Sequence, residues 1–121
     1  MSDNQASGSL EREDFGTVTV LRVKVPMLRD DETTEALFQN TFALVLELGR
    51  PRLVLNLDGV VFLSSTAIGR LVQLINKTRS AGGKLTACRA SRTMQELLQV
   101  THIADILPLY AEEQEAVRSY G

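Results

Sequence analysis

The spacing of apolar residues changes repeatedly along the chain, and each change marks a boundary between a predicted strand and a predicted helix. Over residues 17–25, apolar positions 21, 23 and 25 alternate with Arg22 and Lys24, which is typical of a half-exposed strand. Residues 53–57 form a short apolar run between a proline and an Asp-Gly pair, which favours a buried strand.

Helical spacing follows each of these strands. Over residues 32–48, and again after Ser64, apolar side chains recur at i, i+3 and i+4, the pattern of one buried helix face. Asp30 or Asp31 is placed to cap the first helix and Ser64 the second, because a side-chain oxygen there accepts a hydrogen bond from an otherwise orphan backbone N–H. The same criteria predict an edge strand at 10–15, loops at 27–31 and 58–63, a strand at 84–88, a helix at 92–100 capped by Ser91, a connection at 101–105, a strand at 106–110 and a helix at 112–118.

This alternation of strands and helices predicts an α/β fold with a mixed, largely parallel sheet of four to five strands. Right-handed crossovers should connect the parallel strands. Sites in such folds gather at the carboxyl ends of the strands, so we expect the functional end at the loop after residues 53–57 and at the helix that begins near Ser65. We expect residues 1–9 to be a disordered tail and residues 10–121 to be a single domain.

Composition narrows the class of protein. The chain has 121 residues, 44% of them hydrophobic, and 13 basic against 15 acidic residues give a formal net charge of −2. This balance lacks the basic excess typical of nucleic-acid binding. No apolar run approaches the roughly 20 residues of a membrane span, and the polar N-terminus lacks a signal-peptide core. Together with a single cysteine, Cys88, which we expect to be a small buried residue, this predicts a cytoplasmic protein without a disulfide.

Three adjacent hydroxyls, Ser64-Ser65-Thr66, provide the most suggestive chemistry. They stand at the N-terminus of a predicted helix, where unpaired N–H groups carry the positive end of the helix dipole. A phosphate there would be tolerated and would change a surface rather than melt the fold. The simpler interpretation is that the three residues are only a capping sequence.

Signs of enzymatic or metal chemistry are weak. A catalytic set from Ser65, His102 and Asp58 or Asp105 would lack a nucleophile-elbow pattern. His102 has no ligand companions at metal-binding spacing, and no Gly-Lys-Ser/Thr phosphate loop occurs. We therefore expect no enzyme activity, no metal and no cofactor.

The run from Leu55 to Gly69, LNLDGVVFLSSTAIG, resembles the central motif of the STAS domain, specifically of single-domain anti-sigma factor antagonists of bacteria. The resemblance continues through a Gly82-Gly83 turn into the next strand and covers about residues 16 to 118. It implies helices mainly on one face of the sheet. It also matches Ser65 to the family's phosphoacceptor serine. Thr66 matches the family's second hydroxyl, and Gly69 matches its second glycine. The chain departs from the family pattern at two positions: Ser64 replaces the usual acidic residue, and Ala67 replaces the first glycine.

The resemblance implies a regulatory binding module. The unphosphorylated protein would bind an anti-sigma factor serine kinase, and phosphorylation of Ser65 would weaken that interface. The chain would be a monomer or weak homodimer that binds no nucleic acid and has no membrane segment. Gly69 would pack near the sheet or the partner. The expected partner-binding residues are Asp58, Ser64, Ser65, Thr66, Ala67, Ile68 and Gly69. The alternative is a STAS-like assembly or accessory subunit, of a signalling complex or a lipid transporter, with no switch at the serine.

Overall fold

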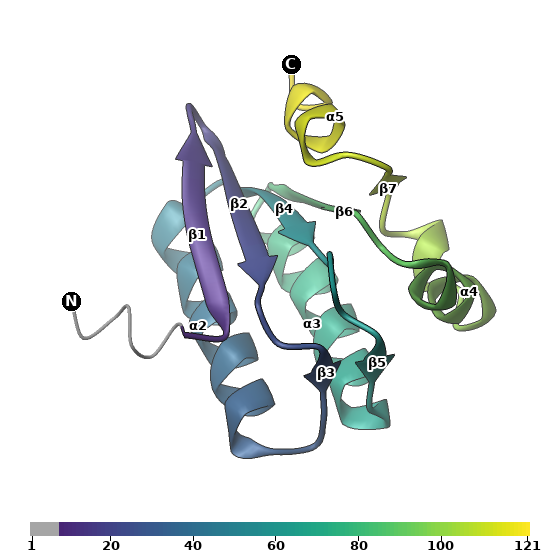
Figure 1. Ribbon diagram of the computed structural model, residues 1–121. Helices are drawn as coiled ribbons and strands as arrows, with labels where there is room; N and C mark the ends of the chain where they lie inside the picture. The colour runs from purple at the N-terminus through teal and green to yellow at the C-terminus, as the bar shows by residue number, and fades with distance from the viewer. Residues whose placement is uncertain (1–7) are drawn as a thin grey trace.

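A computed structural model describes residues 8–121 of the chain, and its centre is a five-stranded sheet (Figure 1). In spatial order the strands are β1 (Leu10–Phe15), β2 (Val18–Val23), β4 (Arg52–Asn56), β6 (Lys84–Cys88) and β7 (Leu109–Tyr110). β1 runs antiparallel to β2, and the other pairs are parallel. The predicted α/β fold with a mixed, largely parallel sheet is confirmed.

Two layers of helices enclose this sheet. α2 (Glu32–Leu48), α3 (Ser65–Ser80) and α4 (Arg92–Val100) contribute side chains to the larger hydrophobic cluster on one face. α5 (Glu113–Arg118) packs Ala116 onto the opposite face, against a smaller cluster that includes Val20, Val54 and Cys88. Figure 1 shows α2 and α3 side by side behind the strands, and α5 apart from them. Most of the helical mass therefore lies on one face, as predicted.

The predicted capping residues begin three of the helices. Asp31 Oδ1 accepts a hydrogen bond from Thr34 N at 2.9 Å, and Ser64 Oγ accepts one from Ala67 N at 3.0 Å. Ser91 Oγ accepts one from Met94 N at 3.1 Å. Because the spacing of a cap is local, sequence was sufficient to place Ser64 and Ser91 and to narrow the first cap to Asp30 or Asp31.

The prediction that the strand at 17–25 is half exposed was wrong. β2 is buried at every position except Arg22, which is half-buried. Its neighbours β1 and β4 cover its edges, the main helices cover one face, and the α5 cluster covers Val18 and Val20 on the other. A short C-terminal helix with few apolar residues gave no sign that it would bury a sheet face.

Smaller differences concern the connecting segments. The loops predicted at 27–31 and 58–63 contain short paired strands, β3 (Met27–Leu28) and β5 (Phe62–Leu63). The connection at 101–105 contains a short 3-10 helix, η1 (Ile103–Asp105). The strand predicted at 106–110 is shorter, because only β7 pairs with β6.

Most of the predicted N-terminal tail, residues 1–7, lies outside the described residues, whereas Gly8 and Ser9 form a turn. In the described part of the chain, no helix is long and apolar enough to cross a membrane.

Candidate functional site

The segment that joins β4 to α3 is held by buried apolar anchors and backbone hydrogen bonds. Leu57 N donates to Cys88 O at 2.9 Å, and Val60 N donates to Leu57 O at 3.0 Å. Leu57, Val60 and Leu63 belong to the main core. Gly59 has φ +85°, a conformation that glycine adopts without steric cost. The turn is therefore held on the side that faces the core, while its other side faces solvent.

β5 pairs with β3, and three apolar side chains in or next to these two strands are exposed. Met27 pairs with Phe62 across the parallel ladder, and Val61 N donates to Pro26 O at 2.7 Å. Met27, Val61 and Phe62 are 39%, 50% and 46% exposed. We call these three residues the apolar patch. Exposed apolar groups that cluster next to polar residues are typical of interaction surfaces.

Sequence analysis missed the apolar patch. Residues 60–63 read Val-Val-Phe-Leu, so the two exposed positions look the same as the two buried ones. Met27 lies far away in the sequence, and only the β3–β5 pairing brings it beside Phe62.

The three hydroxyls have different positions at the start of α3. Ser64 is half-buried and uses its Oγ as the N-cap, whereas Ser65 and Thr66 are exposed in the first turn. Ser64 N donates to Leu28 O at 2.8 Å, which ties the cap to β3. The Ser65 hydroxyl therefore stands on a rigid support, at a helix end whose first N–H groups lack helical partners.

The remaining expected partner-binding residues on α3 separate into surface and core. Ile68 is half-buried and Gly69 is exposed. A Cβ added at Gly69 would meet no atom within 4 Å. The suggestion that Gly69 packs near the sheet is therefore wrong, and its packing against a partner stays a prediction. Ala67 is 0% exposed, so its side chain packs in the core and offers no surface to a partner, contrary to expectation.

An ion pair lies one turn beyond Ser65. Arg70 Nε donates to Glu35 Oε1 at 3.0 Å, which joins α3 to the first turn of α2. Hydrogen bonds from Gln39 and then Arg70 lower the pKa of Glu35. The residues at the start of α3 are thus followed by a guanidinium that already has a carboxylate partner. The sequence spacing did not reveal this pair, because it joins residues 35 positions apart.

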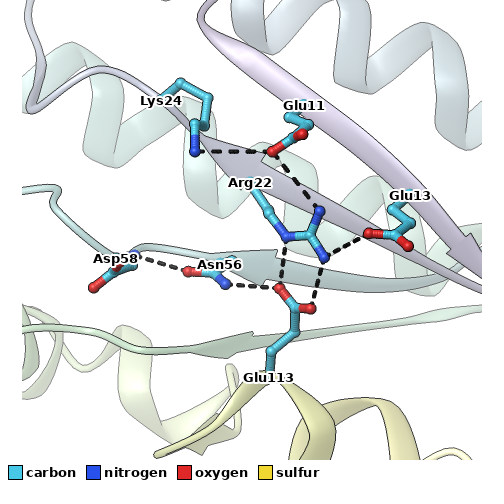
Figure 2. Close-up of polar contacts among 7 residues, drawn as sticks. All are labelled: Glu11, Glu13, Arg22, Lys24, Asn56, Asp58 and Glu113. Atoms are coloured by element: carbon cyan, nitrogen blue, oxygen red, sulfur yellow. Dashed lines mark hydrogen bonds and ion pairs between the residues drawn. The ribbon is translucent and has the colours of Figure 1, made fainter.

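Asp58 lies in the exposed turn after β4 and is connected to the opposite side of the sheet (Figure 2). Asp58 N donates to Asn56 Oδ1 at 2.9 Å, and Asn56 Nδ2 donates to Glu113 Oε1 at 2.8 Å. Arg89 Nη2 lies 3.4 Å from Asp58 Oδ1. Sequence analysis identified Asp58 but not Asn56, Arg89 or Glu113.

The other residues that could take part in chemistry give little indication of a reactive or metal site. Burial raises the pKa of the Cys88 thiol to about 12, so the thiol stays protonated and unreactive near neutral pH. His102 Nδ1 lies 3.3 Å from Asp105 Oδ2, an exposed contact within a single turn. Among residues 8–121, no group of three or more His, Cys, Asp or Glu side chains is arranged to hold a metal.

Comparison with known proteins identifies the family to which this chain belongs. A model of the STAS domain matches residues 9–116. The chain belongs to the STAS domain family. Its resemblance to anti-sigma factor antagonists is confirmed by solved structures with this fold.

An anti-sigma factor antagonist (STAS) domain protein of Planctomyces limnophilus has 27% identity and a TM-score of 0.82, with 93% of this chain and 97% of that chain covered. An anti-sigma factor antagonist of Mycobacterium paratuberculosis has 25% identity, 91% coverage of both chains and a TM-score of 0.76.

The fold of SpoIIAA is also similar. Its unphosphorylated form has 16% identity and a TM-score of 0.71, with 92% of this chain and 96% of that chain covered. The phosphorylated form of the Bacillus protein has 15% identity and a TM-score of 0.66, with 93% and 99% covered.

Proposed function

We propose that this chain is an anti-sigma factor antagonist, which binds an anti-sigma factor serine kinase in the cytoplasm and is switched off by phosphorylation of Ser65. The observation that carries the proposal is the exposed Ser65 hydroxyl, held at a capped helix N-terminus close to the apolar patch. The STAS family and the similarity to anti-sigma factor antagonists support a role as an antagonist of an anti-sigma factor.

In the unphosphorylated state the partner would cover the apolar patch together with the exposed start of α3. Removing apolar side chains from water supplies affinity. The polar groups around them fix the orientation of the partner. The proposed interface consists of Met27, Asp58, Val61, Phe62, Ser64, Ser65, Thr66, Ile68 and Gly69.

Phosphorylation would oppose this interface without unfolding the helix. A phosphoserine carries nearly two negative charges near neutral pH. At Ser65 the charge would lie at the positive end of α3, which stabilises it in the free protein. In the complex the same charge would be desolvated beside the apolar patch, and this cost would weaken binding.

Binding of two charge variants tests the switch. Ser65→Ala should bind the serine kinase as tightly as the unphosphorylated protein and should remain bound when ATP is added. Ser65→Asp should bind at least about tenfold more weakly, a change of about 1.4 kcal/mol in binding free energy. Thr66→Ala is the matched control, since it removes the neighbouring exposed hydroxyl and should still be released by ATP. Equal binding of Ser65→Ala and Ser65→Asp would contradict the switch.

The assembly-subunit alternative is favoured by one observation. The N-cap that precedes Ser65 is the hydroxyl of Ser64, whereas the family pattern places an acidic residue there. If that acidic residue assists the kinase, its replacement would slow phosphorylation. Incubation of the wild type and Ser64→Asp with the serine kinase and ATP separates the alternatives. For a switch, the wild type should be phosphorylated on Ser65 and Ser64→Asp should be phosphorylated faster. For a subunit that lost the switch with the acidic residue, the wild type should stay unmodified and only Ser64→Asp should gain a phosphate.

A further inference from the structure

One rung of the sheet extends the α5 cluster toward the proposed site. Arg22 of β2 pairs with Asn56 of β4, and Asn56 pairs with Cys88 of β6. Cys88 belongs to the cluster under α5. Two polar side chains, Arg22 and Asn56, therefore lie in the same row as Cys88, and Asn56 is two residues before Asp58.

Glu113, the first residue of α5, contacts both polar side chains of this row (Figure 2). Its carboxylate accepts two hydrogen bonds from Arg22, at 2.9 Å from Nε and 2.8 Å from Nη2. Arg22 also contacts Glu13 of β1, at 2.8 Å. The bidentate geometry and the half-buried guanidinium make this a stronger contact than an exposed ion pair.

Asn56 connects this contact to the turn. It is 9% exposed, and its amide uses one end for each neighbour: Nδ2 donates to Glu113, and Oδ1 accepts from Asp58 N. The orientation of the amide is determined by its partners, since a carboxylate needs a donor and a backbone N–H needs an acceptor. Loss of Glu113 would remove the group that orients the acceptor toward Asp58.

A second connection runs beside the first. Arg89 Nη1 lies 2.9 Å from Glu112 Oε1, and Arg89 Nη2 lies 3.4 Å from Asp58 Oδ1. Arg89 has φ +59°, an uncommon backbone conformation for a residue other than glycine. The residues at the start of α5 thus reach Asp58 through both its backbone and its side chain.

We propose that α5 positions the Asp58 turn for partner binding, and that Asn56 is the positioning residue that transmits the contact. This inference rests on the proposed function, because Asp58 belongs to the proposed interface. The inference adds a role for residues on the far face of the sheet. These residues would not contact the partner, but they would determine the shape of the surface that contacts it.

Amide hydrogen exchange on the isolated protein tests the contact without any partner. Glu113→Ala should make the backbone amide of Asp58 exchange at least about tenfold faster, because local opening is no longer opposed by an oriented Asn56 side chain. Amides in the centre of β4 should be unchanged. Gln114→Ala changes the next, exposed residue of α5 and should leave Asp58 at its wild-type rate. Unchanged exchange at Asp58 in Glu113→Ala would overturn the proposal.

Binding then tests the positioning role. Asn56→Ala and Glu113→Ala should weaken binding of the serine kinase about three- to tenfold, with a single cooperative unfolding transition retained, and Gln114→Ala should bind normally. If the kinase binds the wild type and both variants equally, the positioning role is contradicted. If the kinase does not bind even the wild type, the proposed function fails, whereas the exchange experiment still decides whether α5 holds the turn.

Discussion

Ser64 and Ser65 are adjacent hydroxyls with different tasks. The Ser64 Oγ accepts a hydrogen bond from the backbone of Ala67, whereas Ser65 is exposed and is the proposed site of phosphorylation. Ser64→Ala should therefore lower the free energy of unfolding by about 1 kcal/mol through the lost cap. Ser64→Asp should keep most of this stability, because a carboxylate caps equally well and favours the helix N-terminus. Denaturant titration measures both, and equal stability of Ser64→Ala and wild type would show that the cap is unimportant.

Two glycines should respond in opposite directions to the same substitution. A Cβ at Gly83 would clash with the carbonyl oxygen of Pro51, whereas one at Gly69 would meet open space. Gly83→Ala should lower the free energy of unfolding by up to about 3 kcal/mol, as overpacking does. Gly69→Ala should raise it by roughly 0.5–1 kcal/mol, since alanine favours a helix more than glycine does. Thermal unfolding of both variants checks this, and a destabilised Gly69→Ala would contradict the open environment at that position.

Residue-level prediction from sequence succeeded where the information was local. The caps at Asp31, Ser64 and Ser91 depend on the few residues after them, and all three are present. The environments of Ala67 and Gly69 depend on what packs against α3. A family pattern that assigns both to one motif cannot separate a core position from an exposed one.

At the level of elements, α5 differs most from its sequence-based interpretation. The sequence predicted a helix at 112–118 but, because few of its residues are apolar, gave no indication of a buried face. In the structure it covers a second, smaller core, and the Tyr120 hydroxyl just beyond it lies 2.6 Å from Leu53 O and 2.8 Å from Lys84 O. The sequence could not show this, because the attachment depends on polar contacts between residues far apart in the chain.

The docking of α5 should depend on pH through Glu113. Hydrogen bonds from Arg22 lower the pKa of Glu113 below its usual 4.5. A lowered pKa in the folded state stabilises the protein above pH 4.5, and this stabilisation is lost as the pH falls through the lowered value. The wild type should be more stable than Glu113→Gln near pH 7, and the difference should shrink steadily below pH 4.5. A difference in the free energy of unfolding that does not change with pH would contradict the contact.

The short strands β3 and β5 show a different limit of sequence analysis. Two residues cannot display a period, so nothing distinguished these strands from loop. Their pairing nevertheless creates the apolar patch beside Ser65. The part of the proposed interface that is apolar was therefore not predictable from spacing, while the part that carries hydroxyls was.

At the scale of the whole molecule, periodicity predicted the α/β class, and the order of strands and helices is close to the expected one. The central strand and the loop after it were correctly located as the support of α3. What periodicity could not give was the covering of the second sheet face, because the amphipathic signal of a six-residue helix is short. The fold thus places the candidate hydroxyl at the start of α3, which packs on one face of the sheet, and places α5, which we propose positions the Asp58 turn, on the other face.

The most direct test of the switch is the intact mass of the protein, with mapping of the modified residue, after purification from its native cells with phosphatases inhibited. The proposed function predicts a fraction that carries one phosphate, located on Ser65, with no phosphate on Ser64 or Thr66. That fraction should vary with growth conditions. Protein that is unmodified at Ser65 under every condition would contradict the switch and favour the assembly subunit.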